Sequence, residues 1–124
     1  MGDSLVMVVD DDPDIREGLQ DLLVDDGFKV AIAKHGRDAL DQLEGGVHPG
    51  LIVLDLMMPV MDGYEFYRRW AEDPELKRIP LLVVSASQVR EAHKQFAEAT
   101  AFMSKPLEVD RFLAVVEKSV FKPS

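Results

Sequence analysis

The sequence predicts an α/β fold in which a parallel sheet of five strands is covered by helices on both faces. Five short apolar runs recur along the chain, and such continuous runs are typical of strands buried inside a parallel sheet. Between them lie segments whose apolar residues are spaced for one face of a helix. Strands that alternate with helices through short connections favour a parallel sheet. The length of 124 residues suits one domain with its own core.

The first predicted strand and helix follow each other near the N-terminus. Residues 5–9 (LVMVV) form an apolar run, and residues 13–25 carry apolar side chains at helical spacing. Asp12 followed by Pro13 is typical of a helix N-cap with proline at the first helical position. Gly27 predicts the end of this helix, because glycine readily adopts the conformation that terminates helices.

The middle of the chain repeats the alternation. Residues 28–33 (FKVAIA) predict the second strand, and residues 39–43 predict a short second helix that the glycines at 45 and 46 close. Residues 51–54 (LIVL) predict the third buried strand.

The second half of the chain completes the pattern. Residues 64–71 predict the third helix and residues 79–84 (IPLLVV) the fourth strand. We expect a weaker helix over residues 88–99, a short fifth strand over residues 101–103 and a final helix over residues 107–121.

Composition narrows the classes of function. The formal net charge of -9 should repel phosphate backbones and anionic membrane surfaces, so we expect this domain to bind neither nucleic acid nor membrane directly. The lack of cysteine excludes disulfides and thiolate metal sites, which suits a cytoplasmic protein. No apolar run in the sequence approaches the roughly 20 residues of a membrane span.

Polar residues follow four of the predicted strands. In strand order they are Asp10 and Asp11, then Asp55, Ser85 and Lys105. In an open parallel sheet, ligands bind beyond the carboxyl ends of the strands. If the first and third strands are neighbours, about 4.8 Å apart, the three carboxylates come together.

Three carboxylates in one place suit metal-assisted phosphoryl transfer. A hard divalent cation such as Mg²⁺ relieves their repulsion and binds carboxylate, water and phosphate oxygens. One carboxylate can then attack a phosphoryl group to give an aspartyl phosphate. Lys105 could pair with the phosphoryl oxygens, and Ser85 could donate a hydrogen bond to one of them. The alternative of a solvated acidic loop that caps a helix fits Asp12 better than Asp10 or Asp11.

Four motifs together resemble the response-regulator receiver family of two-component signalling. They are VVDDDPDIRE at 8–17, VLDLMMPVMDG at 53–63, VVSA at 83–86 and SKP at 104–106. The resemblance covers residues 3–122 and implies one receiver domain. It also implies a flavodoxin-like, doubly wound sheet of strand order 2-1-3-4-5 flanked by five helices.

The resemblance implies a role for each matching residue at the metal. Asp55 matches the phosphoacceptor, which also contacts the metal. Asp10 and Asp11 match the acidic pair that holds Mg²⁺, with Mn²⁺ as an alternative ion. The main-chain carbonyl of Met57 matches the third protein ligand.

Three further residues match the part of the family that responds to the phosphoryl group. Lys105 matches the lysine that contacts the group, and Ser85 matches the switch hydroxyl. Phe102 matches the switch aromatic, although plain core packing is an equal alternative for this residue.

The resemblance implies partners as well. A sensor histidine kinase or a phosphotransfer protein would donate the phosphoryl group. The surface of the fourth helix, fifth strand and fifth helix would then signal to a downstream protein or an output domain, and a homodimer through that surface stays open. We do not expect an enzyme, because the bulky Met57 side chain should hinder an attacking water and keep self-dephosphorylation slow.

Two alternatives come from other classes of protein. A pseudoreceiver would have the same fold and bind proteins without being phosphorylated, but the complete set of polar site residues argues against it. A phosphatase of the haloacid-dehalogenase type also forms an aspartyl phosphate. It needs a second acid two residues after the nucleophile, where this chain has Met57.

Overall fold

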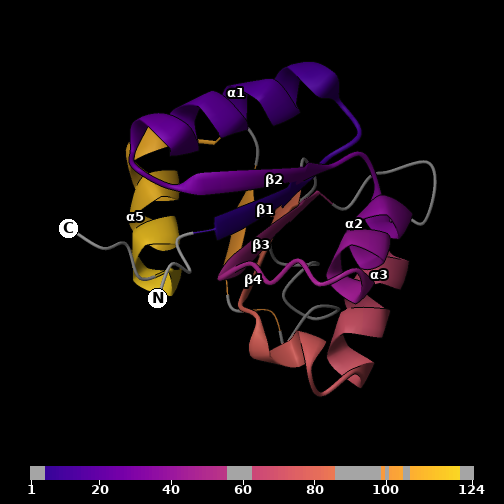
Figure 1. Ribbon diagram of the computed structural model, residues 1–124. Coiled ribbons are helices and arrows are strands. Elements are labelled where there is room, and N and C mark those ends of the chain that lie inside the picture. Colours follow the sequence, from indigo (N-terminus) through magenta and orange to yellow (C-terminus); the bar gives the residue numbers. More distant parts are fainter. Residues whose placement is uncertain (1–4, 56–62, 86–98, 100, 105–106, 121–124) are drawn as a thin grey trace.

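One parallel sheet of five strands runs through the molecule (Figure 1). The computed structural model describes residues 5–55, 63–85, 99, 101–104 and 107–120. The strands are β1 (Leu5–Val9), β2 (Lys29–Ala33), β3 (Leu51–Asp55), β4 (Leu81–Ser85) and β5 (Ala101–Ser104). Their order is β2-β1-β3-β4-β5 and all pairs are parallel, which confirms the predicted sheet. The chain order therefore reverses between β1 and β3, the point where ligands bind in such sheets.

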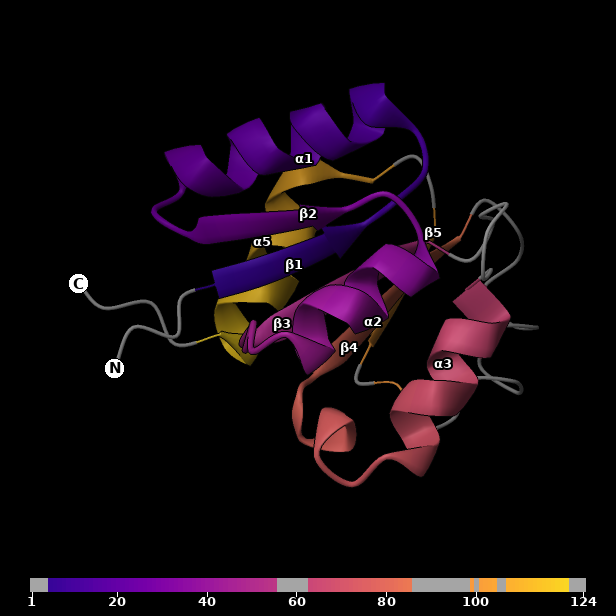
Figure 2. The ribbon, with the colours of Figure 1, turned by 45° about the vertical axis from the view of Figure 1, so that its right-hand side comes forward.

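Helices cover both faces of the sheet (Figure 2). The elements are α1 (Pro13–Asp25), α2 (Gly36–Glu44), α3 (Gly63–Glu72), the 3-10 turn η1 (Leu76–Arg78) and α5 (Val109–Ser119). Helices α1 and α5 lie on one face, and α2 and α3 lie on the other.

Four of the five predicted helices are therefore present among the described residues, which hold four α-helices. The remaining one, predicted over residues 88–99, falls on residues 86–98, outside the described part of the chain.

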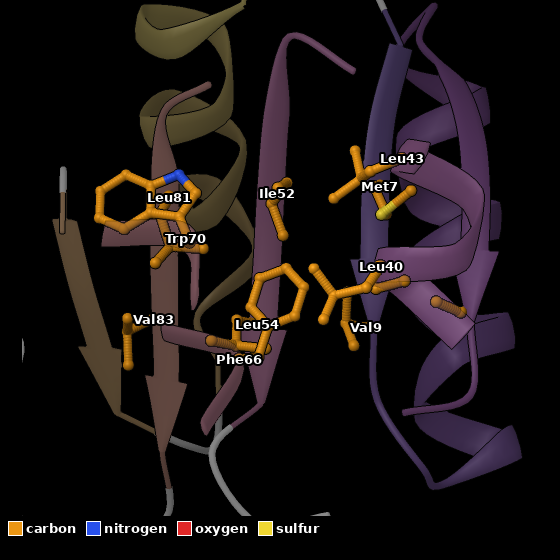
Figure 3. Close-up of a cluster of buried hydrophobic side chains, with 12 residues drawn as sticks. Met7, Val9, Leu40, Leu43, Ile52, Leu54, Phe66, Trp70, Leu81 and Val83 are labelled. Atoms are coloured by element: carbon orange, nitrogen blue, oxygen red, sulfur yellow. The ribbon is translucent and has the colours of Figure 1, made fainter. Parts of the chain in front are cut away.

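Two apolar clusters explain why the strands are apolar along their whole length. Successive residues of a strand point to opposite faces of the sheet, and both faces are covered. On one face, Phe66 and Trp70 of α3 share a buried cluster with Ile52 of β3 (Figure 3). On the other face, Phe112 of α5 shares a cluster with Val53 of β3. Each fully buried side chain of this size contributes about 1.5–3 kcal/mol, so β3 is fixed from both sides.

Helix α1 begins and ends where the sequence predicts. The Asp12 side chain accepts a hydrogen bond from the Asp14 backbone N–H at 2.9 Å, and Pro13 is the first helical residue. Gly27 follows the C-cap residue Asp26 with a φ of 96°, a left-handed conformation that glycine adopts without steric cost. These local signals fix the position of the loop between β1 and α1.

The starts of the fourth strand and of the second helix differ from the predicted ones by two and three residues. The fourth strand begins at Leu81 rather than at residue 79, because Ile79 closes η1 and donates its N–H to the Leu76 carbonyl at 2.9 Å. The second helix begins at Gly36, three residues before the predicted start, because the His35 ring caps its first turn.

The final helix is shorter than predicted at both ends. It begins at Val109 because the Glu108 side chain accepts hydrogen bonds from the backbone N–H groups of Asp110 and Arg111, at 3.2 Å each. It ends at Ser119. Side-chain capping thus sets these helix starts more sharply than apolar spacing does.

Candidate functional site

Three carboxylates meet at the carboxyl ends of two neighbouring strands. Val9 of β1 pairs with Leu54 of β3, so the next residues, Asp10 and Asp55, lie side by side. Asp11 follows directly, and the carboxylates of Asp10, Asp11 and Asp55 have oxygens within 4.8 Å of one another. The structure thus brings together the three acids that the sequence predicts as metal ligands.

Burial separates the three acids. Asp10 is 3% exposed and Asp55 is 5% exposed, and they are the two buried charged residues in the part of the chain that the structure describes. Asp11 is exposed. Burying two neighbouring carboxylates in a core costs free energy that only opposite charge or hydrogen-bond donors can offset. The arrangement is therefore typical of a binding site rather than of core packing.

Hydrogen bonds hold the loop that carries Asp10. The Asp10 backbone N–H donates to the Ala33 carbonyl of β2 at 3.2 Å, and the Asp12 N–H donates to Asp10 Oδ1 at 3.0 Å. Arg16 Nη1 donates to the Asp10 main-chain carbonyl at 2.9 Å. An unsatisfied buried polar group costs about 1–3 kcal/mol, so these bonds make the loop geometry well defined.

Asp12 has a different role from its two neighbours. Its side chain is exposed and caps α1, and it lies outside the three-acid cluster. Of the three consecutive aspartates, the structure therefore assigns two to the site and one to the helix.

The donor set fits a small, hard cation. Mg²⁺ binds six oxygens at 2.0–2.1 Å, which places ligands on one ion about 3 Å apart when adjacent and about 4.2 Å apart when opposite. Carboxylate oxygens that already lie within 4.8 Å of one another can approach these separations around one ion. The chemistry and spacing of Asp10, Asp11 and Asp55 thus suit Mg²⁺ or Mn²⁺.

The remaining predicted site residues are placed only in part. Ser85 is the last residue of β4, one position beyond Val84, which pairs with Asp55. Ser85 therefore reaches the same end of the sheet, and only its backbone belongs to the described part. Met57 and Lys105 lie outside the described residues.

Phe102 lies in the middle of β5 and is half-buried. It packs against the apolar cluster on the α2 and α3 face of the sheet. Phe102 therefore contributes to the core in this structure, and its switching role stays a prediction.

An apolar groove between α1 and α5 lies next to the loop that carries the acids. It encloses about 570 Å³, and its lining residues are Ile15, Gly18, Leu19, Leu22, Leu107, Val109 and Phe112. Ile15 is in the first turn of α1, four residues after Asp11, so the groove begins close to the cluster. The sequence does not predict this groove, because the same apolar spacing is expected of a helix whose apolar face is fully covered by the sheet.

Comparison with known proteins decides the family. A family model described as the response regulator receiver domain matches residues 6–117. The chain belongs to the response-regulator receiver family. The resemblance carried by its motifs is thereby confirmed, and so is the receiver fold.

Two curated relatives of this receiver domain are named response regulators. It is 35% identical over 114 residues to the response regulator Rre1 of Synechocystis sp., covering 90% of this chain and 49% of that protein. The chain therefore spans about half the length of that relative. It is 30% identical to the polar-differentiation response regulator DivK of Brucella ovis, covering 90% of this chain and 92% of DivK.

Solved structures of receivers superpose closely on the chain. Chemotaxis protein CheY4 of Vibrio cholerae has a TM-score of 0.84 and 29% identity, covering 93% of this chain and 97% of that one. The response regulator TrrA of Thermotoga maritima, solved in complex with Mg²⁺–BeF, has a TM-score of 0.81 and 25% identity, covering 92% and 96%. None of the helices among this receiver's described residues is long and apolar enough to cross a bilayer.

Proposed function

We propose that this receiver domain accepts a phosphoryl group on Asp55, in the cytoplasm, from a phosphohistidine of a sensor histidine kinase or a phosphotransfer protein. The observation that carries the proposal is the cluster of Asp10, Asp11 and Asp55 at the reversal of strand order, with carboxylate oxygens within 4.8 Å. A cluster with two buried acids beside an exposed one suits binding of a cation that a phosphate oxygen also approaches.

Asp55 is the carboxylate best placed to be the nucleophile. It is the last residue of β3, the strand that both apolar clusters fix, and it is buried. Asp10 already accepts a hydrogen bond from the Asp12 N–H on Oδ1, which suits an orienting role. An Asp55 oxygen would attack phosphorus while the phosphorus–nitrogen bond of the phosphohistidine breaks. The phosphohistidine carries a proton on its other ring nitrogen, so the imidazole would leave as a neutral ring.

The bound cation, Mg²⁺ or Mn²⁺, would neutralise charge on the transferring phosphoryl oxygens. Asp10, Asp11 and Asp55 would hold it, together with the main-chain carbonyl of Met57. Lys105 and Ser85 would contact the phosphoryl oxygens afterwards, and the position of Ser85 at the end of β4 supports this role.

The phosphoryl group would act as a switch. It adds a charge of roughly -1.5 to -2 and three acceptor oxygens. Movement of Ser85 toward it would leave room for Phe102 to turn, which would change the surface of β5, α5 and the segment before β5. A downstream protein, an output domain or a second copy of the chain would read that change as a shift between two states.

The groove between α1 and α5 is the surface on which we expect the phosphodonor protein to dock. A phosphohistidine must reach Asp55, and the groove is the large apolar depression beside the acid loop. We assign it to an apolar helix face of the donor, because helices laid in grooves bury such side chains.

We further propose that the domain does not turn over phosphate as an enzyme. The Met57 thioether should hinder water at the acyl phosphate. The phosphorylated chain should therefore lose its label slowly, and rapid loss in the absence of a partner would contradict this part of the proposal.

Titration with beryllium fluoride and Mg²⁺, followed by amide NMR, tests the proposal against a phosphorylation-independent pseudoreceiver. The wild-type chain should show saturable shifts at the ends of β1, β3 and β4. Asp55→Asn should show none, whereas Asp14→Asn, an exposed acid outside the cluster, should respond normally. A folded wild-type chain that does not respond would favour the pseudoreceiver.

A further inference from the structure

Arg16 lies in α1 and reaches back to the loop that carries the acids. Its Nη1 donates to the Asp10 main-chain carbonyl at 2.9 Å, and the residue is half-buried. Its own backbone N–H donates to the Asp12 carbonyl at 2.9 Å. The two bonds tie both ends of the acid loop to one helical residue.

The Asp10 carbonyl lies where the chain leaves the sheet. The Asp10 N–H still makes a strand-like bond to the Ala33 carbonyl of β2, at 3.2 Å. Its carbonyl is instead bound by Arg16, and its Oδ1 by the Asp12 N–H. The direction of the Asp10 carboxylate is thus fixed by bonds to its backbone as well as to its side chain.

The partner of the guanidinium matters for the charge of the site. Arg16 bonds a carbonyl oxygen here rather than one of the three carboxylates. It therefore brings a permanent positive charge close to the cluster without occupying a carboxylate oxygen that a cation would use.

We propose that Arg16 is a positioning residue for the cation site. It holds the loop so that Asp10 and Asp11 meet Asp55, and it does so through a hydrogen bond to main chain. The inference rests on the proposed cation-binding function. Replacing a group that orients metal ligands through hydrogen bonds, without binding the metal itself, typically lowers metal affinity by about 10–100-fold.

Calorimetric titration of the full chain with MnCl₂ tests this inference. Arg16→Met should weaken binding by about tenfold. Arg16→Lys keeps the charge but replaces the planar guanidinium with an ammonium, so it should fall between the wild type and Arg16→Met. Arg37→Met is the matched control, because it removes the same charge from an exposed residue of α2 that pairs with Asp41 at 3.5 Å; it should bind like the wild type.

Hydrogen exchange without metal gives a second measurement. The Asp12 amide, which is bonded to Asp10 Oδ1, should exchange faster in Arg16→Met, while the Val53 amide in the core of β3 should keep its protection. If Arg16→Met does not fold, the same comparison is made with Arg16→Lys.

Three results separate the possibilities. Affinity within about twofold of the wild type in the folded Arg16 variants would overturn the inference, and so would an equal loss in Arg37→Met, which would indicate net charge alone. A wild-type chain that binds no Mn²⁺ would contradict the proposed function instead.

Discussion

Asp10 and Asp55 lie side by side at the ends of adjacent parallel strands, both almost fully buried and with carboxylate oxygens within 4.8 Å. This pair is the structural basis of the receiver site. The strands that carry it are fixed by packing on both faces of the sheet, so the two carboxylates cannot move far apart to reduce their repulsion. A cation bound at this point would reduce the repulsion between the two carboxylates.

Replacing Asp10 by asparagine should stabilise the metal-free protein. The oxygens of Asp10 and Asp55 lie within 4.8 Å of each other. Two like charges about 5 Å apart repel by about 3 kcal/mol at an effective dielectric constant of about 20. We therefore expect Asp10→Asn to raise the free energy of unfolding by about 1–3 kcal/mol in chelator, measured by urea denaturation. Added Mg²⁺ should stabilise the wild type but not the variant.

Asp14→Asn is the control for that experiment, since Asp14 is exposed and lies outside the cluster. It should leave the stabilisation by Mg²⁺ intact. An Asp10→Asn variant that is less stable than the wild type in chelator would show that the two carboxylates do not repel as described.

Asp12 should matter for the helix rather than for the metal. Asp12→Ala removes the N-cap of α1 and should lower the free energy of unfolding by about 1 kcal/mol. Asp12→Ser can still accept the hydrogen bond and should retain most of that stability. Urea denaturation measures both effects. Loss of Mn²⁺ binding in the Asp12→Ser variant would contradict the division of roles among the three aspartates.

The groove between α1 and α5 should affect docking of the phosphodonor protein but not the phosphorylation of Asp55 itself. Ile15→Arg places a charge in the apolar groove and should slow phosphotransfer from a phosphorylated histidine phosphotransfer protein by about tenfold or more. Labelling by acetyl phosphate, which needs no docking surface, should be unchanged.

Val24→Arg is the matched control, because Val24 is an exposed apolar residue of α1 that does not line the groove. Its transfer rate should equal that of the wild type. If Ile15→Arg and Val24→Arg slow transfer equally, the groove has no special role in docking.

Local signals account for the parts of the fold that the sequence predicts best. The bounds of α1 match because an N-cap, a proline and a glycine mark both ends. Apolar spacing predicts the start of β4 two residues too early, because Ile79 and Pro80 continue the apolar pattern although Ile79 is the C-cap of η1. Apolar spacing reports burial, and burial alone does not distinguish a strand from the turn that leads into it.

The features that the sequence does not predict depend on the strand order and on the course of a loop. The five apolar runs look alike, so the neighbour relation of Asp10 and Asp55 depended on the strand order that the family resemblance implied. The bond from Arg16 to the Asp10 carbonyl depends on the exact course of a loop. The pattern of residue types in the sequence does not indicate that the Arg16 side chain donates to a main-chain carbonyl six residues earlier.

The measurement that tests the central claim most directly is the mass of the intact chain after incubation with acetyl phosphate and Mg²⁺. The wild type should gain one phosphoryl group, and chelation of the metal should prevent the gain. Asp55→Asn should gain none while remaining folded, and Asp14→Asn should be labelled like the wild type. Retained labelling of Asp55→Asn, or no labelling of the folded wild type, would contradict the account of Asp55 as the phosphoacceptor.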